Sequence, residues 1–240
     1  MANGNFGGGN GTEADPFLVE DAYDLDAIRQ FINDSRKYFI QVNDIDMSGF
    51  GNFAPIGNGY QEAYSVSIGY NGMGHKIYNL YIDNSHATGS QETKTALFGA
   101  VKAGSFITSL GIENCNIIGN YNSFASTAPL VGYTHSTGNR TTIKNCYATG
   151  TVKGGDAGGL VGGYGNFLIE NCYTSCDIYT DAGGGIAYRM DNGEIKNCFA
   201  LNKRIVRTSG TSNAFGDLFG YGNPTITNCY SLDTLEFVEL

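Results

Sequence analysis

IKNCY at residues 143–147 and IENCY at 169–173 are two copies of a short pattern that decides the fold of this 240-residue chain. The core of the pattern, Ile-x-Asn-Cys, occurs five times, at 112–115, 143–146, 169–172, 195–198 and 226–229. A Gly-containing box precedes each copy: ALFGAV from Ala96, PLVGY from Pro129, GLVGGY from Gly159, GGIAY from Gly184 and DLFGY from Asp217. A unit of about 25 to 33 residues cannot bury a core alone, so we expect the copies to stack.

The boxes predict strands rather than helices. Between Leu97 and Val238 the apolar residues lack the 3.6-residue period that a helix in every repeat would need. Short β runs broken by Gly favour an all-β fold, the parallel β-helix, in which each repeat is one coil of about three strands. Within IKNC, the Ile should face inward and the Lys outward, while Asn takes a left-handed backbone and returns Cys to the interior. Stacked coils would form Asn and Cys ladders too widely spaced for disulfides, so the thiols should be free.

The N-terminal part of the chain has a different pattern. Residues 1–14 form a Gly-rich segment, and 15–240 are expected to form one domain. Within it, residues 15–37 predict a strand and a helix from Asp21 to Asn33, which Asp21 would cap. This helix should cover the first coil, 38–95 should form imperfect coils, and 96–240 should contain the five repeats. The prediction is about seven coils in total.

The boxes together resemble the GLUG-motif repeat proteins. The resemblance rests on GGLVG with IENCYT, and on GTEADPFLVEDAYDLDAI, YFIQVNDIDMSG, APIG and NGMGHKIYNL upstream. It covers about Gly9 to Leu240 and implies a right-handed parallel β-helix of the kind used in bacterial surface proteins and phage virions. It implies no single activity and no catalytic residues. GGGIAY at Gly183 departs from the usual LVG.

Composition narrows the function classes. Fourteen Lys plus Arg against 23 Asp plus Glu give a net charge of −9, which disfavours nucleic acid as a partner. No apolar run approaches the length of about 18 residues that spans a membrane, so membrane insertion is not expected. Met1 to Gly11 lacks the features of a signal peptide, so the chain either stays inside the cell until lysis or is a piece of a longer exported protein.

No metal or cofactor is predicted. Five of the six Cys are 26 or 31 residues apart, whereas metal sites space Cys two to four apart and usually add His. Only Cys172 and Cys176 are close, and the three His are scattered.

Two aromatic columns are candidates for binding a glycan or a protein. One follows the ladder Cys and consists of Tyr147, Tyr173, Phe199 and Tyr230. The other follows the Gly box and consists of Tyr133, Tyr164, Tyr188 and Tyr221. Outward rings on neighbouring coils could hold sugar rings, or they could simply stack on each other.

Two carboxylates are weak catalytic candidates. DAGG occurs at Asp156 and again at Asp181, which would place the two acids on neighbouring coils about 5 Å apart. That separation suits a retaining glycosidase or a Ca²⁺ ion, but Asp before Gly is also ordinary turn chemistry.

Loops and the C-terminal strand offer further contact sites. The interval from Cys198 to Leu218 is enlarged, and its extra residues contain the basic cluster Lys203, Arg204 and Arg207. This cluster could meet an acidic partner or sugar, or only offset neighbouring acids. A second enlarged interval adds THSTGNR at 134–140. The last strand, TLEFVEL at 234–240, has no cap after it, so partner contact is expected at Leu235, Phe237 and Leu240.

The preferred function at this stage is a non-enzymatic phage virion protein, part of a fibre or a surface decoration. Its partners would be other virion proteins, further copies of itself, or a host-surface glycan or protein. The first alternative is a bacterial surface or secreted adhesin module. The second is a polysaccharide lyase or hydrolase, which rests on fold analogy alone.

Overall fold

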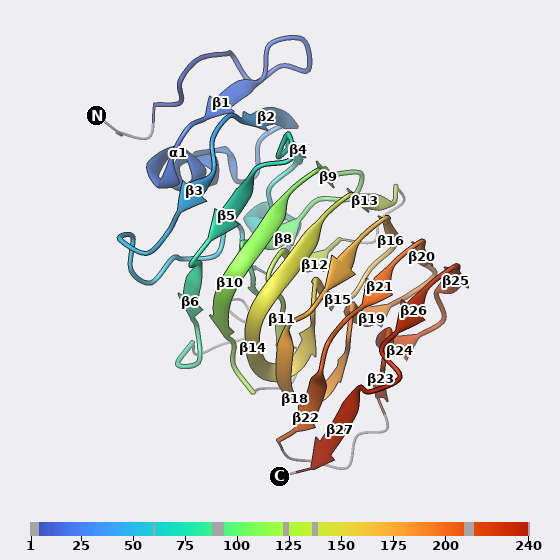
Figure 1. Ribbon diagram of the computed structural model, residues 1–240. Coiled ribbons are helices and arrows are strands. Elements are labelled where there is room, and N and C mark those ends of the chain that lie inside the picture. The colour runs from blue at the N-terminus through green and yellow to red at the C-terminus, as the bar shows by residue number, and fades with distance from the viewer. Residues whose placement is uncertain are drawn as a thin grey trace.

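A computed structural model describes residues 5–59, 61–87, 94–121, 125–135, 139–208 and 214–239. Within these ranges the chain is all-β except for the short helix α1 (Ala22–Ala27) and two 3₁₀ turns, η1 (Ile28–Phe31) and η2 (Glu62–Tyr64). Its strands form three sheets, and every strand pair is parallel. Figure 1 shows the strands stacked from the N-terminal end to the C-terminal end.

Each sheet collects strands from successive repeats. The first sheet runs in the order β1 (Phe17–Val19), β2 (Lys37–Gln41), β4 (Ile68–Asn71), β9 (Phe106–Thr108), β13 (Thr141–Lys144), β16 (Phe167–Glu170), β20 (Glu194–Lys196) and β25 (Thr225–Thr227). The third sheet runs in the order β8 (Phe98–Val101), β12 (Val131–Thr134), β15 (Val161–Gly163), β19 (Ala187–Met190) and β24 (Phe219–Gly222).

The second sheet is the largest. Its main path is β3 (Ile45–Asp46), β5 (Lys76–Tyr78), β10 (Gly111–Ile118), β14 (Tyr147–Gly158), β17 (Tyr173–Thr174), β21 (Phe199–Ala200) and β26 (Tyr230–Ser231). Joined to this path are β6 (Tyr81–Asp83), β7 (Lys94–Thr95), β11 (Ser126–Thr127), β18 (Asp177–Gly184), β22 (Arg204–Arg207), β23 (Phe215–Gly216) and β27 (Glu236–Glu239). The predicted all-β fold with stacked parallel strands is confirmed, and the arrangement is consistent with a parallel β-helix.

The Ile-x-Asn-Cys boxes set the register of the first sheet. Ile143, Ile169 and Ile195 pair in succession and are fully buried, so they form one column of the core. The next residue in each box faces outward, where the Glu170 carboxylate contacts the Nζ atoms of Lys144 and Lys196 at 2.6 and 3.2 Å. Alternating inward and outward side chains are what strand geometry requires.

The Asn of each box has the predicted left-handed backbone, and in four boxes it turns the chain from the first sheet to the second. The expected register of the copy at 112–115 is wrong, because this copy lies within β10 of the second sheet and the residue opposite Ile143 is Ile107 rather than Ile112. Asn114, Asn145, Asn171, Asn197 and Asn228 have φ between 50° and 55°, in the left-handed region that Asn tolerates better than most residues. The carboxamides also join neighbouring coils: Asn197 donates to Asn171 at 3.1 Å, and Asn171 donates to Asn145 at 3.2 Å. A single residue type therefore turns the chain and links neighbouring strands of successive repeats.

The Cys that follows is buried in four of the five copies, and all six thiols are free. The backbone N–H of Cys146 donates to Sγ of Cys172, and that of Cys172 to Sγ of Cys198, both at 3.4 Å. The thiols of Cys172 and Cys198 therefore accept from the backbone of the preceding Cys in the ladder and form no covalent bridge. The prediction of unbridged, inward Cys residues is confirmed.

The glycines of the second box allow two backbones to approach closely. A Cβ on Gly162 would lie 2.8 Å from the carbonyl oxygen of Gly132 and 2.9 Å from the backbone nitrogen of Thr127. A Cβ on Gly132 would lie 2.6 Å from the carbonyl oxygen of Gly99. A larger residue would therefore clash with the neighbouring strand of the third sheet and, at Gly162, also with β11 of the second sheet.

The N-terminal helix is shorter than the predicted span from Asp21 to Asn33. Asp21 caps it as expected, accepting from the backbone nitrogens of Tyr23 and Asp24 at 2.8 and 3.0 Å. The chain then tightens into η1 and becomes extended at Ile32, whose ψ is 132°.

The described part of the Gly-rich N-terminal segment packs against the first sheet. The Phe6 ring stacks on Phe17 with ring centres 4.6 Å apart, and the Phe6 N–H donates to the Asp24 carboxylate at 2.9 Å. Residues predicted to precede the domain therefore contribute to its first layer.

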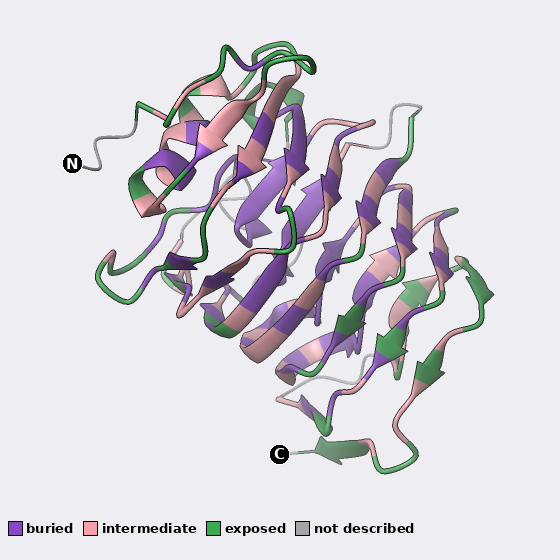
Figure 2. Cartoon of the chain, turned by 45° about the horizontal axis from the view of Figure 1, so that its top comes forward, coloured by how far each residue is buried: buried purple, intermediate pink, exposed green. Residues whose placement is uncertain are grey.

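Burial decreases toward the C-terminal strands. Figure 2 shows buried residues through the middle of the molecule and exposed residues on the strands near the C-terminus. All residues of β25 and β27 are exposed. None of the helices in the described ranges is both long enough and apolar enough to cross a lipid bilayer.

Candidate functional site

The first aromatic column lies on the outer face of the second sheet. Tyr147 and Tyr173 stack with ring centres 4.9 Å apart and parallel planes, and Phe199 and Tyr230 stack at 5.7 Å and 22°. The Tyr147 hydroxyl donates to the Glu113 carboxylate at 2.6 Å. Stacking covers one face of each ring, which leaves less ring surface for a sugar and links neighbouring strands, so this column serves the packing between repeats.

The second aromatic column has a different environment, because cations lie between its rings. We call it the tyrosine–cation cluster and define it as Lys94, Tyr133, Asp156, Tyr164, Tyr188, Arg189 and Tyr221. Its side chains come from β7, β12, β14, β19, β24 and the segment after β15. They meet because the Gly boxes bring the third sheet against the ends of the second-sheet strands.

Lys94 lies at the buried end of the cluster. Its side chain is fully buried, and its Nζ is 5.2 Å from the ring centre of Tyr133 and 5.6 Å from that of Tyr164. The two rings are themselves 6.0 Å apart. Cation–π contacts of this kind help to hold a desolvated ammonium group.

Asp156 occupies the same position as Lys94 two strands further along. Lys94 pairs with Ser126, and Thr127 pairs with Ala157, so Lys94, Ser126 and Asp156 follow each other across β7, β11 and β14. Burial raises the pKa of Asp156 from 3.8 to about 6, while Lys94 and a hydrogen bond from Tyr188 act in the opposite direction. Burial lowers the pKa of Lys94 from 10.5 to about 8, opposed by Asp156. Such shifts mark a desolvated acid–base pair.

Exposure grows along the cluster. Tyr133 and Tyr188 are 8% and 9% exposed, whereas Tyr221 is 52% exposed. Because Lys94 is enclosed, its amine is not placed to act on a polymeric substrate. The accessible chemistry of the cluster is therefore at the Tyr221 end.

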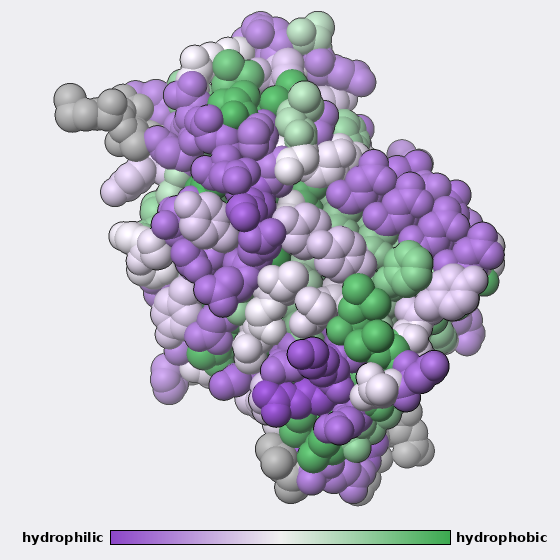
Figure 3. Space-filling view, viewed as in Figure 1, coloured by the Kyte–Doolittle hydropathy of each residue, from purple (hydrophilic) through white to green (hydrophobic). Residues whose placement is uncertain are grey.

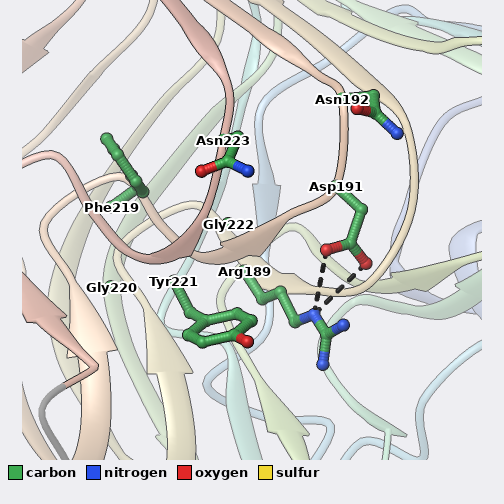
Figure 4. Close-up of a pocket in the computed structure, with 8 residues that line it drawn as sticks. All are labelled: Arg189, Asp191, Asn192, Phe219, Gly220, Tyr221, Gly222 and Asn223. Carbon is green, nitrogen blue, oxygen red and sulfur yellow. Dashed lines mark hydrogen bonds and ion pairs between the residues drawn. The ribbon is translucent and has the colours of Figure 1, made fainter.

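Arg189 connects the buried end to the open end. Its guanidinium carbon is 4.5 Å from the ring centre of Tyr164 and 5.0 Å from that of Tyr221. Its Nε donates to both carboxylate oxygens of Asp191, each at 3.2 Å. Figure 4 shows Arg189 beside the Tyr221 ring with both bonds to Asp191.

These groups line a pocket of about 490 Å³ at the edge of the third sheet. Asn192 and Asn223 contribute carboxamides to it, and Phe219, Gly220 and Gly222 complete its wall. In Figure 4 the polar side chains come from two segments, the one that includes and follows β19 and the one that includes and follows β24.

The expected pairing of Asp156 with Asp181 is wrong. Asp156 is opposite Ala182 in the ladder between β14 and β18. The segment from Asp181 contains one Gly more than the segment from Asp156 before the next apolar residue, so aligning the two DAGG motifs shifts the register by one residue. A shift of one turns a side chain to the opposite face.

The neighbours of the two acids agree with this correction. Asp181 accepts from the Thr208 hydroxyl at 2.7 Å, whereas Asp156 faces Tyr188 and Lys94. The paired-carboxylate geometry that a retaining glycosidase would use is therefore not formed by these residues.

The basic cluster lies largely in a strand rather than a loop. Arg204 and Arg207 are the two ends of β22, and they pair with Asp177 at 2.9 Å and Glu239 at 2.7 Å. Lys203 is exposed just before the strand. The interpretation that these cations offset neighbouring acids is supported for the two arginines. Residues 209–213 of this interval, and 136–138 of the other enlarged interval, lie outside the described residues.

The predicted contact residues at the last strand are only partly described. Phe237 is 52% exposed, Leu235 packs in part against the core, and Leu240 lies outside the described residues. Phe237 pairs with the buried Ile205 of β22. Whether these residues contact a partner stays a prediction.

No group of three His, Cys, Asp or Glu side chains that could hold a metal ion occurs among the described residues. The face in Figure 3 is largely polar, and its apolar side chains gather in small separate areas. It therefore lacks the large apolar patch that is typical of an obligate interface.

Sequence reasoning missed Lys94, Arg189, Asp191, Asn192 and Asn223. These polar residues lie within a few positions of a Gly box and belong to no repeated pattern, and polar residues usually face solvent. The sequence contains one feature that could have identified Arg189, because this residue directly follows Tyr188 of the second column.

Three comparisons place the chain among known proteins. No family model matches it. It is 34% identical to Halomucin of Haloquadratum walsbyi over 163 residues, which is 64% of this chain and 2% of that protein. It is 27% identical over 131 residues to a protein of Evansella cellulosilytica described as a candidate Gly-rich membrane protein, covering 53% of this chain and 14% of the relative. The chain thus spans a small fraction of both relatives.

Among solved structures, the chain resembles a Bacteroides ovatus protein described as a candidate immunoglobulin A1 protease. The TM-score is 0.76 at 21% identity, over 98% of this chain and 80% of the other. This likeness is one of fold, and it shows that nearly the whole chain adopts a known arrangement of stacked parallel sheets.

Proposed function

We propose that the chain is a non-enzymatic repeat module of the GLUG type, displayed at a surface, where it contacts a glycan or a protein. In this proposal the three sheets are the walls of a right-handed parallel β-helix of about seven coils. The repeat boxes support it, because four of the five Ile-x-Asn-Cys copies, those that begin at Ile143, Ile169, Ile195 and Ile226, join a strand of the first sheet to the next strand of the second sheet.

The non-enzymatic assignment rests on one observation: the Cys, Asp and Arg side chains that could act in catalysis are buried, out of register with each other or paired with neighbouring side chains. Five of the six Cys residues are buried, and burial raises the pKa of Cys172, which disfavours the thiolate that a nucleophile needs. Asp156 and Asp181 are out of register. The arginines of β22 pair with acids on adjacent strands. These groups serve contacts between coils.

The relatives favour a surface setting. One is named as a mucin and the other as a membrane protein, and both are much longer than this chain. A repeat module within a long surface protein agrees with both names. The phage virion role remains a prediction that neither relative tests.

The main competing function is that of a protease, and it comes from the name of the structural neighbour. At 21% identity that neighbour supports the fold alone. A protease would require a nucleophile and base held together in an accessible cleft.

A cleavage assay separates the two functions. The purified chain would be incubated with immunoglobulin A1, polygalacturonate and a neutral glucan, and the products analysed by mass spectrometry. We expect no cleavage of any substrate. Cleavage that is lost in the Asp156→Ala, Asp181→Ala double variant would contradict the non-enzymatic proposal and restore the acids as catalytic candidates. Cleavage that persists in that variant would also contradict the non-enzymatic proposal, and it would show that residues other than Asp156 and Asp181 are catalytic.

The surface setting is tested separately. Antibodies against the chain should label intact cells of the producing organism or purified phage particles. Labelling that appears only after cells are broken, with none on particles, would contradict a surface role.

A further inference from the structure

The pocket at the edge of the third sheet has the composition of a sugar-binding site. We infer that it binds a neutral hexose unit of a glycan, with Tyr221 against the sugar ring and Arg189, Asp191, Asn192 and Asn223 at its hydroxyls. This inference rests on the proposed function as a contact module and names the partner class. Its volume, about 490 Å³, is within the usual range for small-ligand sites, about 300–1,000 Å³.

The polar lining suits neighbouring hydroxyl groups. A carboxylate offers two acceptors, a carboxamide one acceptor and one donor group, and a guanidinium a planar set of donors. Adjacent sugar hydroxyls, each both donor and acceptor, can bond to such planar groups in pairs. The lining provides all three types within one pocket.

The ring of Tyr221 supplies the apolar part of the site. More than half of its side chain is exposed, in contrast to Tyr133 and Tyr188 of the same column. Arg189 lies 5.0 Å from its ring centre and supports it from one side. In the first column, Tyr147 and Tyr173 each have one ring face covered by the other at 4.9 Å, and Tyr173 is less exposed than Tyr221, at 38% against 52%.

The charges of the pocket favour a neutral ligand over an acidic one. Arg189 is bound by the Asp191 carboxylate through two bonds of 3.2 Å, so its positive charge is already offset. The chain as a whole has a net charge of −9, which would repel an acidic polysaccharide.

The Arg189 side chain has contacts on several sides that do not depend on a ligand. Arg189 lies between the rings of Tyr164 and Tyr221, and Gly163 leaves the space that it needs. A Cβ on Gly163 would be 3.1 Å from the Cβ of Arg189. A fixed site loses little conformational freedom on binding, which improves affinity.

The test is a binding titration with defined probes. Methyl glucoside, methyl galactoside and methyl mannoside, then the matching neutral polymers, would be titrated into the chain by calorimetry, with polygalacturonate as the acidic probe. We expect binding of at least one neutral probe and none of polygalacturonate. Tyr221→Ala should weaken the neutral binding about tenfold.

The matched control is Tyr230→Ala, because Tyr230 is 60% exposed but belongs to the first column. Its affinity should equal that of the unchanged chain, and Asn223→Ala should show a partial loss. No binding of any neutral probe, equal losses in the two tyrosine variants, or a preference for polygalacturonate would overturn the inference. The proposed function fails on a different result, cleavage of a substrate, so the two failures are distinguishable.

Discussion

Asn171 combines two tasks in one side chain. Its backbone has a φ of 55°, and its carboxamide accepts from Asn197 and donates to Asn145. Left-handed backbone is costly for most residues with a Cβ, whereas Gly adopts it freely. The position therefore needs either Asn, which also links the coils, or Gly.

We predict that Asn171→Ala lowers the free energy of unfolding by about 2 kcal/mol, because it adds backbone strain and removes both carboxamide bonds. Asn171→Gly should cost about half as much, since it removes only the bonds. Urea unfolding followed by circular dichroism measures both. Equal losses would show that the carboxamide bonds, and not the backbone conformation, decide the effect.

At the residue scale the repeat boxes were predictable and the tyrosine–cation cluster was not. The alternation within IKNC assigns Ile inward and Lys outward without further information, because strand geometry fixes it. Lys94, by contrast, reads as an ordinary surface lysine. Its burial depends on Tyr133 and Tyr164, which come from other repeats.

At the scale of elements, glycine-rich strands were the weak point of the sequence interpretation. The Gly-rich ends of β14 and β18 can be aligned in two registers that differ by one residue. The sequence does not distinguish them, because glycine has no side chain to show which face of the strand points inward. The Gly box of the following strand, where Leu160 aligns with Ile186, gives the correct offset. A register taken from buried apolar residues is therefore more reliable than one taken from a repeated turn motif.

The burial of Lys94 on β7 and of Asp156 near the end of β14 predicts an unusual dependence of stability on pH. Asp156 has a pKa of about 6 in the folded protein against an ordinary 3.8, so the folded state binds this proton more tightly than the unfolded chain. Its contribution to the free energy of unfolding should fall as pH rises from 3.8 to about 6. Lys94 has a lowered pKa, so its contribution should rise with pH from about 8 to 10.5.

Urea midpoints measured across this pH range check the prediction. Asp156→Asn should flatten the acidic limb, and Lys94→Met, which keeps most of the side-chain volume, should flatten the alkaline limb. Unchanged profiles in both variants would mean that the two groups are solvated rather than buried.

At the scale of the whole molecule, burial decreases along the stack, and the Cys residues report it. Cys115, Cys146, Cys172 and Cys198 are at most 2% exposed, while Cys229 is only partly buried. Iodoacetamide should therefore modify Cys229 first in the native protein and all six thiols in urea. Peptide mass spectrometry over time gives the order. Early modification of Cys172 would show that the middle of the stack opens before its C-terminal strands.

The Asn and backbone bonds that join one strand to the next have a mechanical consequence. They run along the stacking direction, and the two ends of the chain lie at opposite ends of the stack (Figure 1). Tension applied between these ends would break the hydrogen bonds of one strand before those of the next. The repeats would therefore unfold one after another, and a whole sheet would not separate at once. Asn171 and Asn197 are 26 residues apart, so each such step would release roughly 90 Å of extended chain. Under the tension that a flowing medium exerts, such a molecule would lengthen in small steps, one repeat at a time.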